Sequence, residues 1–392
     1  MRRSLLRIGT SSLRASKRTQ ACTTLKYFRR RFHDTNPLPP EDEWRTRFPS
    51  SVVAVRDRVS VRVPDTASLL AEGFLEGKSI AAGDNKVIIE VYPGPGALSR
   101  ALLHLSDKRV KRLIILEPWK DFYPCVKSLE EADPRVTVLN LDGYVWDSYQ
   151  TIEDQGLLKD VVKQDWNAGV HPQLHFICQM PNTVHGEQFL SQIFRCIPTR
   201  SWLFQYGRVP MSLILNQAVA DRLVAPHSSK FRGKVAVLTE ATADVQFAVR
   251  PSQLEPYDDH FHPVTPPTST VNTRRHQPHV ALNVVPYEQQ LINIDEADHW
   301  DYVLRRLFVL KSTPLKKAIS NLAPGAQSLL KILTDVNLPL QERVNVDRKV
   351  KELSIKDWAL IVRAFKNWPF APDDLTFINV EGIIGKRGNG GN

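Results

Sequence analysis

The sequence lacks a hydrophobic segment that could cross a bilayer, because no apolar run approaches the ~20 residues that a spanning helix needs. It also lacks the apolar core of about 7–15 residues that would follow the charges of a secretory signal. The four cysteines form no CxxC pair, which gives no support to a metal cluster or a disulfide framework. We interpret Cys125, Cys178 and Cys196 as small buried residues and predict no metal site and no membrane contact.

Residues 1–33 lack acidic side chains, yet they contain ten of the 52 Lys and Arg. The remaining 42 basic residues equal the 42 Asp and Glu in number, so the rest of the chain is formally neutral. An acid-free, Arg-rich N-terminus in which Leu5, Leu6 and Leu13 can share a helical face is typical of a mitochondrial presequence. We therefore predict a presequence over residues 1–33 and a location in the mitochondrial matrix. A basic arm that binds nucleic acid directly is the alternative.

Apolar β-branched runs alternate with amphipathic segments up to about residue 290, which predicts a doubly wound α/β sheet with right-handed crossovers. Strands are expected at 87–91, 113–116, 136–139, 174–178, 202–204, 235–239, 245–249 and 281–285. Helices are expected at 66–75 with Asp65 as N-cap, 97–105, 123–132, around 189–194, and at 211–223. The Pro-rich stretches 36–43 and 263–278 are interpreted as a linker and a surface loop.

After Glu288 the strand signals stop, and five short helices are expected at 303–310, 315–322, 327–334, 348–353 and 356–365. The chain should therefore contain an α/β domain over 34–290 and an all-helical domain over 291–376. Residues 377–392 end in a Gly-rich sequence that contains two cations, and they should form a mobile tail.

One stretch combines a buried strand, a Gly-rich turn and a helix, with Gly94 and Gly96 in the turn. This arrangement can hold a nucleotide-like ligand at a helix N-terminus. Glu117 ends the second strand, 21 residues after Gly96, where a carboxylate is placed to accept hydrogen bonds from ribose hydroxyls. Asp142 follows the third strand. Tyr92 stands where a glycine would let the backbone approach a ligand.

Several segments resemble the ribosomal RNA adenine dimethyltransferase family over about residues 60–370. They are the turn at 90–98, the helix and loop at 216–225 and 229–234, and the Pro-rich segment 261–267. The resemblance implies a Rossmann-like S-adenosylmethionine methyltransferase domain followed by a small all-helical domain. It also implies a set of cofactor-binding positions, namely Tyr92, Gly94, Gly96, Glu117, Asp142 and Gln179.

In its predicted mitochondrial presequence and in the Tyr-Pro-Gly form of the turn, the chain is most similar to the fungal mitochondrial transcription factor B branch of this family. That branch implies mitochondrial RNA polymerase and promoter DNA as partners, and a C-terminal tail that reaches toward the polymerase active site. The alternative is an active mitochondrial small-subunit rRNA adenine N6,N6-dimethyltransferase. A general RNA-binding factor of the mitoribosome is a third possibility.

The stretch Gln179-Met180-Pro181-Asn182 departs from the family's catalytic motif, which is Asn, an apolar residue, Pro and an aromatic residue. Gln179 moves the amide outward by one methylene, and catalysis is sensitive to a misplacement of ~1 Å. Asn182 removes the ring that would stack on the target base, a contact worth ~1–3 kcal/mol. The segment 61–64 also lacks the family's Gln-Asn-Phe-Leu motif. We therefore expect the catalytic positions Gln179 and Asn182 to be inactive. The pocket that would hold the target adenine in an active enzyme could instead take a flipped promoter base.

Basic residues on expected loops are candidates for phosphate contacts. They are Lys230, Arg232, Lys234, Arg274, Arg275, Lys311, Lys316, Lys317, Lys386 and Arg387. For each single residue of this set, a solvated surface charge is the alternative and the default interpretation. Aromatic residues near strand ends could stack on unpaired bases. They are Trp119, Tyr144, Trp146 and Tyr149, and core packing is the alternative for Trp146.

Overall fold

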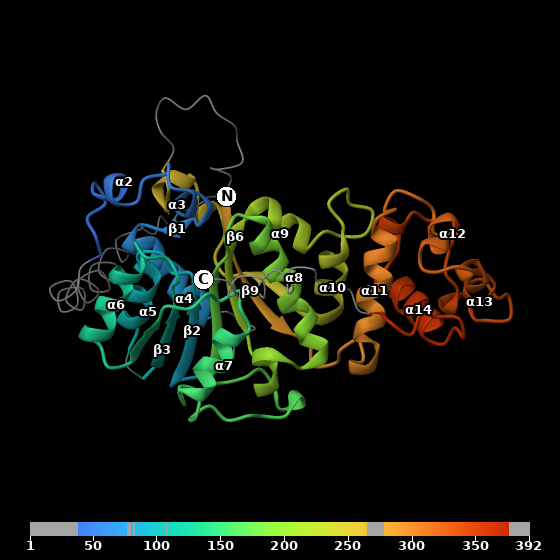
Figure 1. The fold of residues 1–392 in the computed structure, drawn as a ribbon, viewed down its shortest axis with the longest axis horizontal. Helices are drawn as coiled ribbons and strands as arrows, with labels where there is room; N and C mark the ends of the chain where they lie inside the picture. Colours follow the sequence, from blue (N-terminus) through green and yellow to red (C-terminus); the bar gives the residue numbers. More distant parts are fainter. Residues whose placement is uncertain (1–37, 77–79, 81–82, 107, 265–277, 376–392) are drawn as a thin grey trace, which may run out of the picture.

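The computed structural model of this 392-residue chain describes residues 38–76, 80, 83–106, 108–264 and 278–375 (Figure 1). The expected presequence, Arg274, Arg275 and the C-terminal tail with Lys386 and Arg387 lie outside the described residues. Their predicted roles therefore stay predictions.

A seven-stranded mixed sheet forms the centre of the larger part of the structure (Figure 1). Its strand order is β4-β3-β2-β5-β6-β9-β7, in which the first five strands are parallel and β9 is antiparallel to β6 and β7. The strands are β2 (Lys86–Val91), β3 (Val110–Leu116), β4 (Val136–Leu139), β5 (Leu174–Gln179), β6 (Met211–Asn216), β7 (Ala243–Phe247) and β9 (His279–Pro286). A separate two-stranded sheet pairs β1 (Ser60–Val61) with β8 (Phe261–His262). The predicted α/β class is confirmed.

The order of the parallel strands reverses between β2 and β5. From β2 the chain adds β3 and β4 on one side, whereas β5 and β6 extend the sheet on the other side. At such a point the two connecting segments leave the sheet in opposite directions, which opens a crevice at the carboxyl ends of the strands. The candidate site lies there.

Helices cover both faces of the sheet. Successive residues of a strand face opposite sides, so the apolar residues of the central strands need cover on both faces. Ile88 packs in a core with α4, α5 and α6, whereas Ile89 packs in a core with α7, α8 and α10. The helices of this part are α2 (Trp44–Arg47), α3 (Val53–Asp57), α4 (Pro64–Leu75), α5 (Ala97–His104), α6 (Tyr123–Ala132), α7 (Asp147–Asp154), α8 (Val184–Thr199), α9 (Gln217–Leu223) and α10 (Lys234–Thr242). Short 3-10 turns are η1 (Trp166–Ala168), η2 (Trp202–Tyr206), η3 (Pro251–Gln253) and η4 (Tyr257–Asp259).

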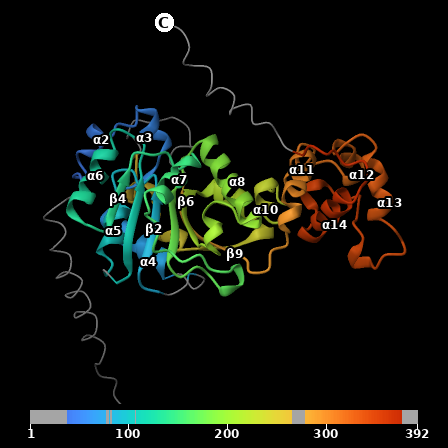
Figure 2. The same cartoon turned by 60° about the horizontal axis from the view of Figure 1, so that its bottom comes forward.

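The remaining helices lie at one end of the molecule, beside α10 and away from α5 and α6 (Figures 1 and 2). They are α11 (Ala297–Phe308), α12 (Leu315–Ala318), α13 (Leu329–Leu333) and α14 (Ile355–Lys366), with 3-10 turns η5 (Ile294–Glu296), η6 (Ile319–Asn321), η7 (Ala326–Ser328), η8 (Leu340–Glu342) and η9 (Val350–Glu352). The core on the α8 face continues through Trp300 and Leu304 to Trp358. Because this core is continuous, the division into two domains at residue 290 stays a prediction.

Three predicted elements of the sheet region are wrong in type, at 202–204, 211–223 and 235–239. Residues 202–204 form the 3-10 turn η2 instead of a strand, and the predicted helix 211–223 is the buried strand β6 followed by α9. All six residues of β6 are buried, so the run has no alternation that would separate a strand from a helix. The side chain of Asn216 ends the strand and caps α9 by accepting a hydrogen bond from the Ala218 amide (2.8 Å).

The predicted strand 235–239 is also wrong, because these residues lie within helix α10. Most of α10 is buried, and a short apolar run of this kind fits a buried helix as well as a strand. Asp65 is not the N-cap of α4 either. Val63 occupies that position, Pro64 begins the helix, and Asp65 lies in the first turn.

Candidate functional site

The turn after β2 has the backbone conformation of a glycine-rich loop. Tyr92, Gly94 and Gly96 all have positive φ angles, of 58°, 63° and 86°. A side chain at Gly94 would meet the Ser60 hydroxyl at 2.1 Å, so only glycine fits that position. Tyr92 adopts a left-handed conformation that bulky residues rarely occupy. The contacts of its ring and hydroxyl must therefore compensate for the strain.

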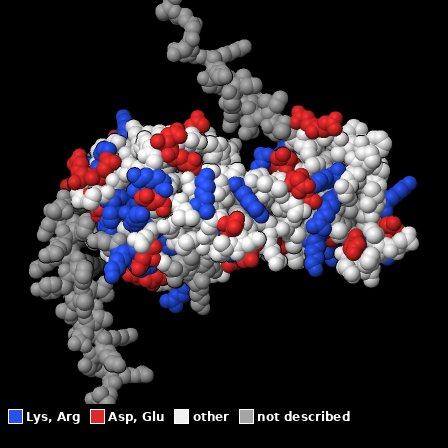
Figure 3. Space-filling model, turned by 90° about the horizontal axis from the view of Figure 1, so that it is seen from below, with Lys and Arg blue, Asp and Glu red and all other residues white. Residues whose placement is uncertain are grey.

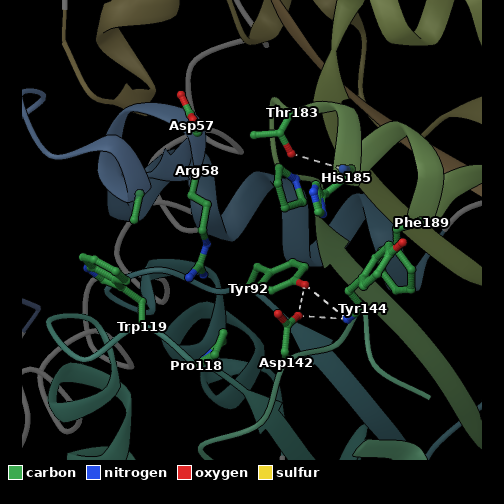
Figure 4. Close-up of a pocket in the computed structure, with 13 residues that line it drawn as sticks. Asp57, Arg58, Tyr92, Pro118, Trp119, Asp142, Tyr144, Thr183, His185 and Phe189 are labelled. Atoms are coloured by element: carbon green, nitrogen blue, oxygen red, sulfur yellow. Dashed lines mark hydrogen bonds between the residues drawn. The ribbon is translucent and has the colours of Figure 1, made fainter. Parts of the chain in front are cut away.

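A cavity of about 340 Å³ opens at the carboxyl ends of the strands beside this turn (Figure 4). Of the predicted cofactor-binding residues, Tyr92 and Asp142 line it. Of the aromatic residues predicted to stack on bases, Trp119 and Tyr144 line it, and Trp146 and Tyr149 do not. Arg58 lines it as well. The other lining residues are Ala54, Asp57, Pro118, Pro181, Thr183, His185, Gly186 and Phe189. Gly94, Gly96, Glu117, Gln179 and Asn182 are not among the lining residues, although they belong to the same strand ends and turn.

The Glu117 carboxylate is fully engaged by groups of the chain itself. The Arg58 guanidinium donates to both oxygens, with Nη1–Oε1 at 2.6 Å and Nη2–Oε2 at 2.5 Å. The amides of Gly94 (3.2 Å) and Trp119 (2.9 Å) also donate to it. The Glu117 side chain is 0% exposed and that of Arg58 is 12% exposed. This is a buried bidentate ion pair, the strongest geometry available to these two groups.

The Asp142 carboxylate accepts hydrogen bonds from the chain at one of its oxygens. The Tyr92 hydroxyl donates to Asp142 Oδ1, which also accepts from the Tyr144 amide at 3.0 Å (Figure 4). Burial, together with the charge of Asp142, raises the pKa of the Tyr92 phenol, so the hydroxyl keeps its proton and remains a donor. The Arg58 guanidinium lies 4.8 Å from the centre of the Tyr92 ring, a cation–π contact that joins the two pairs.

Gln179 and Asn182 are held by the surrounding backbone. The Gln179 amide nitrogen donates to the Pro93 carbonyl, and its oxygen accepts from the Val61 amide, both at 3.1 Å. The Gln179 side chain is buried. Asn182 follows β5, and its backbone amide donates to the Asp57 carbonyl at 2.7 Å. Gln179 therefore ties the turn to the N-terminal segment instead of facing the cavity.

Arg58 reaches the site because residues 38–58 are folded against the sheet domain. Trp44 and Phe48 are buried in a small core with Phe122, and the Phe48 carbonyl bonds to the His262 ring at 2.7 Å. The described part of the predicted linker, residues 38–43, is a mostly exposed, hydrogen-bonded turn that the Trp44 indole anchors by donating to the Pro39 carbonyl. No sequence signal identifies Arg58, because its partner Glu117 is 59 residues away and α3 is only five residues long.

The basic residues predicted to contact phosphate differ in solvent exposure and in their ion pairs. Lys230 and Lys317 are exposed, whereas Lys234 pairs with Asp301 and Lys316 pairs with Asp347. Arg232 is 1% exposed and binds Glu240 (2.6 Å) and the Ala225 carbonyl (2.9 Å), so it cannot reach a phosphate in solvent. On the face in Figure 3, cations are spread over both parts of the molecule and interspersed with acids.

Metal-binding clusters and membrane-spanning helices are both absent from the described part of the chain. No group of three or more His, Cys, Asp or Glu side chains is placed to hold a metal ion there. None of the described helices is long and apolar enough to cross a membrane.

Comparisons with known proteins agree with the resemblance. Mitochondrial transcription factor 1 of Lachancea kluyveri is 26% identical over 310 residues, which cover 76% of this chain and 86% of that protein. The protein of the same name from Saccharomyces cerevisiae is 24% identical over 295 residues, covering 74% and 82%. Mitochondrial dimethyladenosine transferase 1 of Bos taurus is 28% identical over 192 residues, covering 47% and 53%.

A solved dimethyladenosine transferase from Plasmodium falciparum superposes with a TM-score of 0.47 and 15% identity, covering 78% of this chain and 97% of that one. The family model described as ribosomal RNA adenine dimethylase matches residues 69–367, which is most of the chain. The chain therefore belongs to the ribosomal RNA adenine dimethylase family.

Proposed function

We propose that this chain is a mitochondrial transcription initiation factor, which acts in the matrix and helps mitochondrial RNA polymerase to find and open promoters. The similarity to proteins named mitochondrial transcription factor 1 extends over three quarters of the chain and supports this function. The second candidate is the activity in the family's name, methylation of rRNA adenine with S-adenosylmethionine as methyl donor. The retention of Glu117 and Asp142 favours it.

The observation that supports the first function most strongly is the Arg58–Glu117 pair. In a methyltransferase of this family, the acid at this position would accept hydrogen bonds from the cofactor's ribose. Here the two oxygens of Glu117 already accept from Arg58 (twice), Gly94 and Trp119, which uses the lone-pair sites of a carboxylate. The Tyr92 hydroxyl donates to one oxygen of Asp142, which is another of the expected cofactor-binding residues. These residues do not fit S-adenosylmethionine.

The residues expected to bind the target adenine also argue against methyl transfer. Activating an adenine amine needs a free amide or carboxylate oxygen and an aromatic face beside it. The Gln179 amide is engaged at both ends, and Asn182 has no ring. The chain therefore would act by binding and not by methyl transfer.

The remaining cavity suits an unpaired base. The rings of Tyr144 and Trp119 line it, the buried ring of Phe189 lies in its wall, and the cavity volume exceeds that of one base. Trp146, which is 39% exposed, packs against Phe189 beside it. A promoter base that flips out of the melted duplex would stack there and hold the strands apart.

A paired experiment separates the two candidate functions. The full chain is added to the cognate mitochondrial polymerase in a run-off assay, and S-adenosylmethionine binding is measured by calorimetry. We expect correctly initiated transcripts only when the chain is present, and no binding heat at millimolar cofactor. Tight cofactor binding together with methylation of a small-subunit rRNA hairpin would overturn the proposal.

Tyr144→Ala should weaken promoter opening without affecting the fold, because the ring lies on the cavity wall and its loss removes one stacking face. Stacking on one aromatic ring is worth ~1–3 kcal/mol, so the open fraction should fall several-fold or more. A 2-aminopurine base in the melted region reports the opening. Phe370→Ala removes an exposed ring of the helical part and serves as the control. An unchanged fluorescence rise with Tyr144→Ala would contradict a role of this cavity in melting.

A further inference from the structure

Residues 57–61, which run from the end of α3 into β1, lie across the carboxyl ends of three adjacent strands, β3, β2 and β5. The Asp57 carbonyl accepts from the Asn182 amide, just after β5, at 2.7 Å. The Val61 amide donates to the Gln179 side chain, at the end of β5, at 3.1 Å. Between these two contacts, the segment packs on the glycine turn after β2 and pairs with the carboxylate that follows β3. We call residues 57–61 the strap.

Within the strap, Arg58 makes the hydrogen bonds that a ribose would make. A vicinal diol can donate one hydrogen bond from each hydroxyl to the two oxygens of a carboxylate. The Arg58 guanidinium donates one bond to each oxygen of Glu117 in the same way. A carboxylate at the end of the second parallel strand of a doubly wound sheet is the group that accepts from ribose hydroxyls. The strap therefore fills this position with a side chain of the protein itself.

Aromatic rings hold the guanidinium in place. It lies 4.8 Å from the centre of the Tyr92 ring and 5.3 Å from that of Phe122. Figure 4 shows the Arg58 side chain reaching from the end of α3 toward the Tyr92 ring. Phe122 also packs edge-on against Phe48, with ring centroids 5.1 Å apart, and Phe48 is buried in the core that anchors residues 38–58. Arg58 is thus fixed by the folding of the N-terminal segment and not by the turn alone.

The Arg58 guanidinium also separates Glu117 from the neighbouring cavity. Arg58 lines that cavity, whereas Glu117 does not, so shortening Arg58 would join the carboxylate to the space of about 340 Å³. Tyr92 is the second obstacle, because its hydroxyl occupies one oxygen of Asp142. Its φ angle of 58° is one that glycine adopts without strain.

We propose that Arg58 is a built-in substitute for the ribose of the family's cofactor, and that Arg58 and Tyr92 together make the strand ends reject a nucleoside. The proposal rests on the proposed absence of S-adenosylmethionine binding and goes further, because it names the two side chains that exclude the cofactor and makes the exclusion reversible. With both side chains shortened, the Glu117 carboxylate loses its fork of donors, and a nucleoside with a free diol satisfies it.

The test compares the full unaltered chain with the double variant Arg58→Ala and Tyr92→Gly. Urea denaturation followed by circular dichroism gives the unfolding midpoint at increasing concentrations of S-adenosylhomocysteine. Because a ligand that binds only the folded protein raises the midpoint, a destabilised variant still reports binding. We expect the midpoint of the double variant to rise and that of the unaltered chain to stay constant. Adenosine should bind the double variant about 10- to 150-fold more tightly than 2′-deoxyadenosine, because the deoxy compound lacks one hydrogen bond to a charged group.

Two single variants complete the test. Arg58→Ala keeps the Tyr92 ring, and ethylguanidinium should fill the vacated place and raise the unfolding midpoint of this variant. Arg135→Ala is the matched control, because Arg135 forms a bidentate pair with the buried carboxylate of Asp133, with side chains 14% and 5% exposed. Neither residue of that pair lines the cavity, so S-adenosylhomocysteine should not shift the midpoint of Arg135→Ala.

A folded double variant whose midpoint does not respond to S-adenosylhomocysteine, or which binds adenosine and 2′-deoxyadenosine equally, would refute the proposal. If the double variant is already unfolded without urea, the absence of a midpoint rise for Arg58→Ala with ethylguanidinium would refute it. Binding of S-adenosylhomocysteine by the unaltered chain would refute it together with the argument against methyl transfer. Failure of the unaltered chain to support run-off transcription would overturn the proposed function but not the role of Arg58.

Discussion

Replacement of Arg58 by alanine should destabilise the folded protein by about 3–5 kcal/mol. Arg58 and Glu117 form a bidentate pair in which neither side chain has substantial contact with water. Removing the guanidinium leaves a buried carboxylate whose remaining donors, among the described residues, are the two amides of Gly94 and Trp119. The cation–π contacts of Arg58 with Tyr92 and Phe122 are lost as well. Urea denaturation followed by circular dichroism measures the free energy of unfolding.

Arg109→Ala is the matched control. Arg109 also forms an ion pair, with Glu76, but the Glu76 side chain is 61% exposed. An exposed pair of this kind contributes about 0–1 kcal/mol, because water solvates the released carboxylate. The double variant Arg58→Met with Glu117→Leu should recover part of the loss, since it leaves no unpaired buried charge. Equal losses for Arg58→Ala and Arg109→Ala would show that the buried pair does not hold the site closed.

The sequence is sufficient to predict the strands and turns that build the site. The predicted strand ends at Glu117 and Asp142 and the Gly-rich turn are confirmed, because β-branched runs and Gly spacing are local signals. Tyr92 is recognisable in the sequence as an anomaly, but not as the donor that occupies Asp142. The partner of Glu117 could not be predicted, because the pairing depends on how residues 38–58 fold back over the turn.

The same limit applies to the basic residues. Arg232 and Lys230 are equivalent in the sequence, yet one is buried under a loop and the other is exposed on it. Their difference arises from Glu240 on α10 and from the contacts with Lys311 and Lys351, which are tertiary. The assignment of β6 and α10 failed for a related reason. Both segments are buried on nearly all sides, and burial of that kind removes the periodicity that distinguishes a strand from a helix.

Glu90 is the second buried carboxylate of the turn region. Unlike Glu117, which pairs with Arg58, it forms no ion pair with a described residue. Its side chain is fully buried in β2, and neither oxygen meets hydrogen-bond geometry with a described residue, although the Ser99 hydroxyl is near enough to oppose the rise of its pKa. Burial raises the pKa of Glu90 to about 8; Glu117 adds to the rise, and Ser99 and Arg100 oppose it. Glu90 is therefore protonated in the folded protein at neutral pH, whereas in the unfolded chain it ionises at its ordinary pKa.

Glu90→Gln should therefore remove a pH dependence of stability. Below the unfolded-state pKa both states are protonated and the carboxyl group causes no penalty. As the pH rises toward the folded-state pKa of about 8, the unfolded chain releases a proton that the folded protein retains, so the unaltered protein loses stability. Each unit of pKa difference corresponds to about 1.4 kcal/mol. Relative to Glu90→Gln, the unaltered protein should lose on the order of 3 kcal/mol between pH 5 and pH 8.

Urea denaturation at pH 5, 6.5 and 8 gives the free energy of unfolding for both proteins, and Glu76→Gln controls for the loss of an exposed carboxylate. The two stability curves should diverge as the pH rises, with the Glu90→Gln protein the more stable at pH 8. Parallel curves would mean that Glu90 is ionised in the folded protein. It would then need a cationic partner, and Arg100 is the guanidinium whose charge acts on it. The glycine turn would in that case contain two ion pairs, and its retained acids would both be neutralised by the chain itself.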